Sequence, residues 1–237
     1  RDKLVTGVQT CALPILCKTI MNFIKALGTV AFFTMAVTGC STSNEYLDLS
    51  NPVRVVAEES NGPTVCVSDV TDSRVFIGDG SKDDTPSGSV LSEEYTSRAY
   101  ARLKTAIGEP AGGLLLPNDK TVASVVKETI EKALADSGYS VVENAAAEDQ
   151  GVINVAISVK KFWAWPEKGN LNTSIKSAIE LDVYMQDGAT QRHLNLKNTQ
   201  TRKALTATKA QYKKVTEDSL SNIYYLATQK FKALPKN

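Results

Sequence analysis

The chain has 237 residues, of which 42% are hydrophobic and 22% are charged. This composition is typical of a globular protein with one substantial core or two small ones, and it excludes a chain that is disordered throughout. The formal net charge is +1, but residues 1–39 contain four of the basic residues and one of the acidic residues. From residue 40 onward, 23 basic and 25 acidic residues leave a net charge of −2. That balance provides no electrostatic footprint for nucleic acid.

The first 39 residues divide into two segments. Residues 1–15 show neither helical nor strand periodicity, and we expect residues 1–20 to be a non-native or untranslated leader outside the fold. Residues 21–39 have the pattern of a signal peptide, with Lys25 in a short n-region and an apolar h-region over residues 26–37. The h-region is too short for a permanent membrane-spanning helix, which needs about 20 apolar residues. We therefore expect the segment to be removed on export.

The signal pattern ends in a lipobox. Val37-Thr38-Gly39-Cys40 matches the lipobox of bacterial lipoproteins at all four positions. The match implies that the Cys40 thiol, as the nucleophile for thioether formation, carries diacylglycerol. It also implies cleavage between Gly39 and Cys40 and acylation of the new amino terminus, for instance by palmitate. Ser41 rather than Asp follows the cysteine, which indicates the outer membrane, facing the periplasm. The competing interpretation is a buried helix that ends at Gly39, with Cys40 in the core.

Residues 40–63 are predicted to form the lipidated N-terminus and a flexible tether, because Ser, Asn, Pro and Gly occur there without sustained periodicity. A single domain is expected over residues 64–237. Its first strand is expected in "TVCVSDV", residues 64–70, followed by a loop over residues 79–92. The segment 93–110 fits both a helical and a strand face, and its end favours a strand. Cys66 lies between valines and is expected to be a buried, inert thiol without a disulfide partner.

The second half of the domain has clearer periodicity. A helix is expected to begin near Asn118 or Asp119 and to stop at Gly138. Four strands are expected at residues 139–143, 152–165, 173–186 and 192–204. The third alternates best, with apolar residues on one side of the strand and polar residues on the other. A last amphipathic helix is expected over Lys209 to Leu234. The prediction is an α+β fold: a mostly antiparallel sheet of about four to six strands, with two amphipathic helices packed on one face.

No catalytic motif stands out. His193 is the only histidine, and no pattern of Cys or paired carboxylates surrounds it, so a surface position is expected. The chain contains no GxSxG, HExxH, phosphate-loop or dinucleotide-binding pattern. The acidic run at residues 79–84 lacks the register of a calcium-binding loop. We therefore predict no catalytic residues, no metal site and no cofactor.

Two groups of residues are candidates for a partner or ligand patch. The first is polar and follows the first strand: Asp69, Asp72 and Arg74. These side chains either recognise a ligand or fix the strand exit through local hydrogen bonds, and the second interpretation is favoured. The second group is aromatic: Phe162, Trp163 and Trp165. In a strand the two tryptophans share one face and Phe162 lies on the other. Core packing is favoured for this group over a partner patch.

The mature chain resembles the YajG-type lipoproteins of proteobacteria. The resemblance is carried by the lipobox, the opening "VCVSDVTDSRVFIGDG", the passage "VKETIEKALADSGYSVVE", the strand "INVAISV" and the C-terminal amphipathic helix. It runs in order and spacing from about Val65 to Phe231, except for the segment from Asp79 to Asn118. The resemblance implies a lipoprotein that faces the periplasm, and it implies no catalytic residues.

These observations together predict a non-enzymatic envelope lipoprotein with a structural or accessory binding role. Its expected contacts are the membrane, through the N-terminal lipid, and an envelope protein partner. The first alternative is an auxiliary lipoprotein subunit of an envelope transport or assembly complex, with "KKFWAW" as an interface. The second alternative, which the sequence favours least, is a periplasmic hydrolase.

Overall fold

A computed structural model describes residues 44–50, 62–78, 82–105, 107–143, 151–169 and 173–235. The predicted leader and signal peptide, the lipobox residues Gly39 and Cys40, and residues 51–61 of the predicted tether lie outside the described residues. In the part of the chain that is described, no helix is both long enough and apolar enough to cross a membrane.

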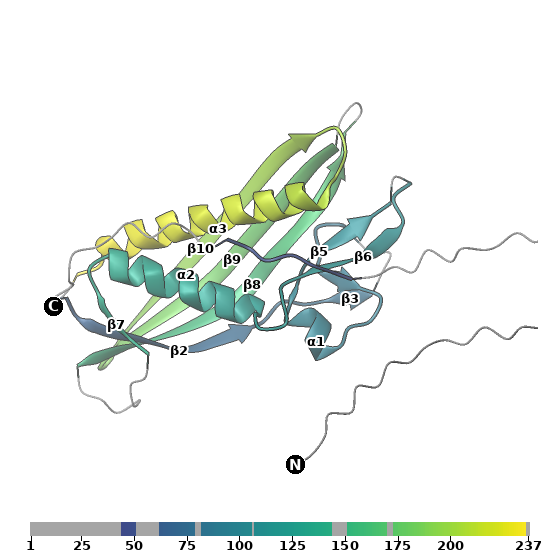
Figure 1. The fold of residues 1–237 in the computed structure, drawn as a ribbon. Coiled ribbons are helices and arrows are strands. Elements are labelled where there is room, and N and C mark those ends of the chain that lie inside the picture. The colour runs from purple at the N-terminus through teal and green to yellow at the C-terminus, as the bar shows by residue number, and fades with distance from the viewer. Residues whose placement is uncertain are drawn as a thin grey trace, which may run out of the picture. The chain divides into compact units, whose positions relative to one another are not determined.

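Three long antiparallel strands form one side of the main sheet (Figure 1). β8 (Val152–Lys168) pairs with β9 (Thr173–Asp187), which pairs with β10 (Thr190–Ala204). The apolar side chains of β9 are buried: Ile175, Ile179, Leu181, Val183 and Met185. The alternate side chains are partly or fully exposed: Lys176, Glu180, Asp182 and Gln186. The predicted alternation, with one dry and one wet face, is therefore confirmed.

The other edge of β8 is shared by two strands that run parallel to it. β2 (Thr64–Asp72) pairs with residues 152–159, and β5 (Ala99–Lys104) pairs further along the strand, where Ala101 faces Ala164. The sheet continues from β2 to the parallel strand β7 (Ser140–Val142). From β5 it continues to the antiparallel strand β6 (Pro110–Leu115) and then to β1 (Glu45–Tyr46), which is parallel to β6. A separate two-stranded sheet joins β3 (Ile77–Gly78) and β4 (Ser87–Gly88).

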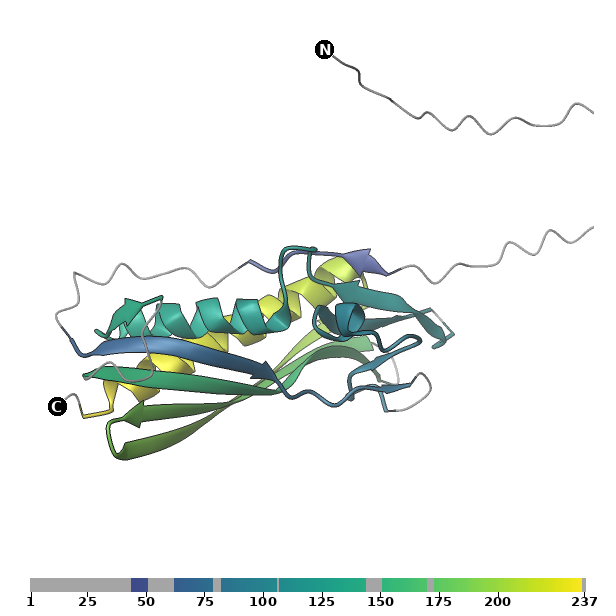
Figure 2. The same ribbon diagram turned by 90° about the horizontal axis from the view of Figure 1, so that it is seen from below.

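The main sheet thus has eight strands in a mixed arrangement, and the expectation of a mostly antiparallel sheet of four to six strands is wrong. The physical reason lies in helix α2 (Val122–Asp136), which carries the chain from the end of β6 back to the start of β7. Strands β7 and β8 therefore begin at the same end of the sheet as β2 (Figure 2), and strands that begin at one end pair in parallel. The α+β class itself is confirmed.

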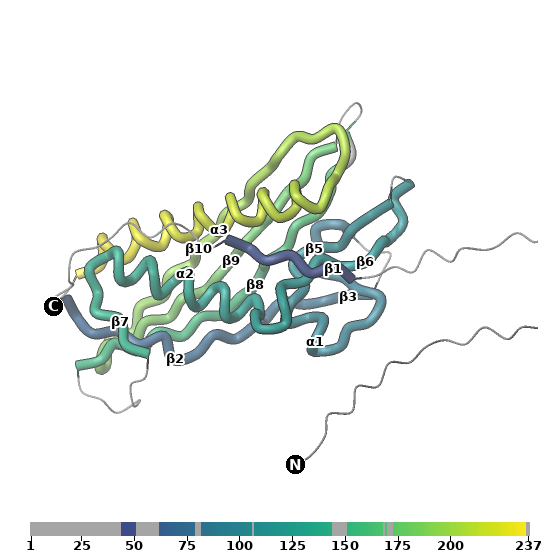
Figure 3. The backbone as a smooth tube through the Cα atoms, in the orientation of Figure 1, coloured from purple at the N-terminus to yellow at the C-terminus, as the bar shows by residue number. Residues whose placement is uncertain are grey.

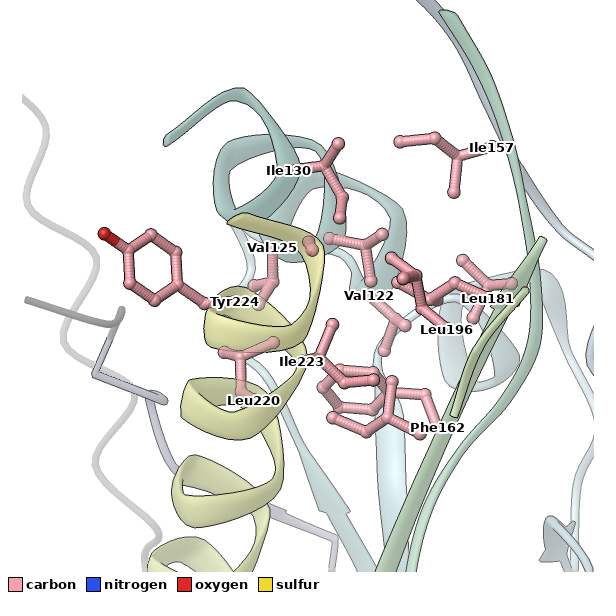
Figure 4. Close-up of a cluster of buried hydrophobic side chains, with 14 of the residues drawn as sticks. Val122, Val125, Ile130, Ile157, Phe162, Leu181, Leu196, Leu220, Ile223 and Tyr224 are labelled. Atoms are coloured by element: carbon pink, nitrogen blue, oxygen red, sulfur yellow. The ribbon is translucent and has the colours of Figure 1, made fainter. Parts of the chain in front are cut away.

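Two amphipathic helices cover the dry face of the sheet, as predicted. α2 is capped by Thr121, whose hydroxyl accepts a hydrogen bond from the Ser124 amide at 3.1 Å, and the chain leaves it at Gly138 with a φ of 85°. α3 (Lys209–Lys232) is the C-terminal helix, and α1 (Glu93–Thr96) is a short third helix. Side chains of both long helices meet those of the sheet in one core (Figure 4): Val122, Val125, Ile130, Ile157, Phe162, Leu181, Leu196, Leu220 and Ile223.

The segment 44–50 belongs to the fold, so the prediction of a flexible tether is wrong for these residues. Glu45 and Tyr46 extend the sheet beside β6, and Leu49 is 1% exposed in the main core. The segment runs next to α3 (Figure 3), where the backbone amide of Ser50 donates to Glu217 Oε1 at 2.8 Å. Seven residues are too few to show periodicity, which is why the sequence did not reveal this element.

Candidate functional site

The polar residues predicted as a candidate patch lie where β8 changes partners. Asp72 is the last residue of β2 and faces Val159, whereas the next partner of β8, through Ala101 and Ala164, is β5. A register shift in the β8–β9 ladder between Val159 and Lys161 marks the same place. The backbone groups between the two partner strands need hydrogen-bond donors, because β8 cannot pair with both strands there. We call this place, where β8 passes from β2 to β5, the fork. The side chain of Arg74 lies in the fork and supplies these donors.

The Arg74 guanidinium uses all five of its N–H donors within the protein. Nε and Nη2 form a bidentate pair with Asp72, at 2.8 Å to Oδ1 and 2.7 Å to Oδ2. Nη1 donates to the carbonyls of Ala99 at 2.6 Å and Phe162 at 3.1 Å, and Nη2 also donates to the carbonyl of Thr96 at 2.6 Å. The side chain is 0% exposed. The Asp72–Arg74 pair therefore joins β2, α1, β5 and β8 and has no donor left for a ligand.

Asp69 does not join this fork. Its side chain is exposed on β2 and accepts a hydrogen bond from the hydroxyl of Thr71 at 2.8 Å. Of the three polar residues that the sequence grouped together, the structure thus combines Asp72 and Arg74 in one buried interaction and leaves Asp69 at the surface.

The three aromatic residues lie around the same fork. Phe162 is buried in the main core, whereas Trp163 is buried on the opposite face with Tyr95, and Trp165 packs partly buried against that second cluster. The predicted division of the faces, with both tryptophans on one side, is confirmed. The indole of Trp163 donates to the carbonyl of Asp83 at 3.2 Å, so its polar atom is bound within the protein. Because Trp163 is 0% exposed, Trp165 is the only one of the three that presents surface to a partner.

Phe76 links the aromatic cluster to the polar fork. Its ring lies edge-on to Trp163, with centroids 5.9 Å apart, and edge-on to Tyr95 at 6.3 Å. The Arg74 guanidinium lies over the Phe76 ring, 5.0 Å from its centroid. Sequence reasoning did not select Phe76, although it follows Arg74 by two residues, as a strand neighbour on one face would. Except for Asp69, the residues of the two predicted groups thus lie together around the fork.

His193 lies on the wet face of the sheet, as its surroundings in the sequence predicted. Its Nε2 is 2.9 Å from Asp182 Oδ1, and its ring stacks on Tyr184 with centroids 4.6 Å apart. The amide of Asn195 donates to the same carboxylate oxygen at 3.1 Å. The hydrogen bonds from Asn195 and His193 lower the pKa of Asp182. Among the described residues, no group of three or more His, Cys, Asp or Glu side chains is placed to hold a metal ion.

An open surface pocket of about 620 Å³ lies between the β5–β6 hairpin and the start of α3. It is lined by apolar and charged residues from four elements and the loop before α3: Glu45, Leu103, Lys104, Ala111, Ala207, Thr208, Lys209 and Ala210. Sequence reasoning missed this pocket because no motif joins its parts.

Comparison with known proteins gives only distant likenesses. No family model and no curated protein matches the chain significantly. Among solved structures, a Xanthomonas campestris protein of family DUF330 is 13% identical, with a TM-score of 0.45 over 80% of this chain and 93% of that one. An uncharacterised protein is 11% identical, with a TM-score of 0.44 over 79% and 96%. A candidate lipoprotein from Caulobacter crescentus is 11% identical, with a TM-score of 0.28 over 46% and 77%. Likenesses at this level do not establish the YajG-type resemblance, which stays a prediction.

Proposed function

We propose that the protein is a lipid-anchored lipoprotein of the bacterial outer membrane, facing the periplasm, with a non-catalytic structural or accessory binding role. The observation that carries the proposal is the lipobox at residues 37–40, and the described fold begins only four residues after it. Asn44, four residues after Cys40, is already bound to the domain, since its Oδ1 accepts a hydrogen bond from the Gly113 amide at 3.0 Å. An acylated Cys40 would therefore hold the domain directly at the membrane, because several acyl chains make attachment effectively permanent.

The non-catalytic part of the proposal rests on what the polar side chains do. The buried Asp72–Arg74 pair connects strands β2, β5 and β8 with helix α1, and every guanidinium donor takes part in these contacts. His193, which the periplasmic-hydrolase alternative would need, lies on the exposed face of β9 and β10 beside Asp182 and Tyr184, and it does not line the pocket at the start of α3. These features favour a structural or binding role over a catalytic one.

The lipid anchor is tested by a pair of cysteine substitutions in the full chain, expressed in a bacterium with an outer membrane. Cys40→Ser is expected to abolish incorporation of labelled palmitate and to move the protein from the membrane to the soluble periplasmic fraction. Cys66→Ala is the matched control, because it removes the other cysteine of the mature chain, a buried thiol in β2. Palmitate labelling of Cys40→Ser at the level of the control would overturn the proposal.

A second candidate role, an auxiliary subunit of an envelope transport or assembly complex, is favoured by strand β10. Among the described residues this 15-residue strand pairs only with β9, so its other edge can accept a strand from a partner. A photo-activatable residue at Thr199 in β10 is expected to give a discrete cross-linked product in cells. The same residue at the exposed Ser124 of α2 is the control. Identical product patterns from both positions would remove the support for this role.

A further inference from the structure

One end of the domain exposes two large aliphatic side chains on neighbouring loops. Ile107, in the turn between β5 and β6, is 82% exposed, and Leu205, in the loop between β10 and α3, is 91% exposed. The pocket between these elements is lined in part by Leu103, Ala111 and Ala207, which lie two to four residues from Ile107 or Leu205 along the chain. Figures 1 and 2 both show the β5–β6 turn and the start of α3 at the same end of the domain. We call Ile107, Leu205 and the pocket between them the apolar end.

The chain enters the fold at the apolar end. Glu45 lines the same pocket and forms an ion pair with Lys209 at the start of α3. Cys40 precedes Glu45 by five residues, and an extended chain covers about 3.3–3.6 Å per residue, so the two lie at most about 18 Å apart. A lipid on Cys40 therefore confines the apolar end to the membrane surface, which it can reach without any rearrangement of the domain. This step rests on the proposed lipid anchor.

We propose that the apolar end docks on the lipid bilayer, with Ile107 and Leu205 inserted at the level of the headgroups. The chemistry of this end fits a bilayer better than a protein partner. Protein interfaces are enriched in aromatic residues, Met and Arg, whereas this end exposes aliphatic side chains on two loop tips. Apolar side chains at such positions bury in the boundary between headgroups and acyl chains.

Electrostatic attraction is not the main contribution to this docking. The lysines that line the pocket are paired with carboxylates, Lys104 with Asp83 and Lys209 with Glu45. The nearby Arg202 likewise pairs with Asp218 at 2.9 Å. Lys203, two residues before Leu205, is exposed, and Asp218 is shared with Lys214, so some positive charge remains at this end. Because the charges in the pocket itself are paired, the contact depends mainly on apolar burial. The docking is accordingly expected on vesicles of zwitterionic lipid as well as on vesicles that contain anionic lipid.

The test uses the full lipidated chain, purified from membranes and reconstituted into phosphatidylcholine vesicles that contain nitroxide-labelled lipid. A fluorescent dye is attached at Thr206→Cys, next to Leu205, or at Ala189→Cys in the β9–β10 turn. The 15 residues of β10, at about 3.4 Å each, place these two sites about 50 Å apart. Quenching at position 206 is expected to be at least about twofold stronger than at position 189, because an interfacial site lies about 5–10 Å inside the headgroup boundary.

A second variant separates docking from mere proximity. Adding Ile107→Asp and Leu205→Asp to the Thr206→Cys protein is expected to reduce its quenching to the level found at position 189, while the protein remains in the vesicle fraction. Equal quenching at positions 206 and 189 in the parent protein, or no loss in the double aspartate variant, would overturn the proposal. Failure of the anchor is recognised separately. Cys66 is 2% exposed, so a free Cys40 thiol would take up a second dye and the protein would leave the vesicles.

Discussion

Replacement of Arg74 by methionine tests the role of the buried fork most directly. The substitution removes a guanidinium that is 0% exposed and leaves its partner Asp72, 22% exposed, without its counter-ion. Breaking a buried ion pair from one side costs about 3–5 kcal/mol. The carbonyls of Thr96, Ala99 and Phe162 lose their donors as well, and each unsatisfied buried group costs about 1–3 kcal/mol. Because Asp72 regains water and these losses are not additive, we expect the free energy of unfolding to fall by at least about 3 kcal/mol.

The assay is urea unfolding of the secreted Cys40→Ser form, followed by tryptophan fluorescence, since Trp163 is buried beside the fork. Arg202→Met is the matched control, because it removes an arginine whose side chain is 47% exposed and whose ion-pair partner Asp218 is 32% exposed. That change is expected to cost less than about 1 kcal/mol. Arg74→Lys keeps the positive charge but loses the planar guanidinium, so its loss of unfolding free energy is expected to lie between those of the two methionine variants. Equal unfolding midpoints for Arg74→Met and Arg202→Met would refute the reasoning.

Three further predictions concern stability. The buried hydroxyl of Tyr212 has no hydrogen-bond partner among the described residues, and burial raises its pKa. The stability linked to the protonated phenol is therefore fully present below the ordinary pKa of 10.0 and is lost as the pH rises above that value. Tyr212→Phe is expected to stabilise the protein by up to about 1–3 kcal/mol and to raise its alkaline unfolding midpoint; unchanged alkaline unfolding would contradict this. A methyl group at Gly113 would lie 2.7 Å from the ring of the buried Tyr95, so Gly113→Ala is expected to lower the free energy of unfolding, measured by thermal unfolding, by about 1–3 kcal/mol. Gly78→Ala is the control and is expected to be nearly neutral, because a methyl group there would lie in open space. Hydrogen bonds lower the pKa of Asp182, so the stability that they add is present above the ordinary pKa of 3.8 and is lost as the pH falls through the lowered pKa. Asp182→Asn is therefore expected to make the free energy of unfolding less dependent on pH in acid, and an unaltered dependence would argue against this.

The elements that the sequence predicted well carry their signals locally. The alternation of β9 is visible over a few residues and the apolar stripe of α2 over a few turns, and Gly138 alone indicates the end of the helix. The mixed sheet could not be read in this way. Whether β2 runs parallel to β8 depends on the path of the chain through α2, and a strand pattern has the same period in both directions.

The candidate site was predicted only in part for a similar reason. The proximity of Asp72 and Arg74 in the sequence indicated a local pair, which the structure contains. The other acceptors of the guanidinium lie 22, 25 and 88 residues away along the chain, in Thr96, Ala99 and Phe162. Their role is carried by backbone carbonyls, which leave no residue-type signal in a sequence. The pocket at the start of α3 escaped prediction because it too is assembled from distant segments.

The lipid on Cys40 is the central claim, and mass spectrometry of the protein isolated from membranes tests it most directly. The lipobox predicts that the N-terminal peptide begins at Cys40 and carries a thioether-linked diacylglycerol together with an amide-linked acyl chain. Every peptide that contains residues 21–39 should then be missing from the mature protein. A peptide that spans Gly39 and Cys40 with an unmodified thiol would contradict the account.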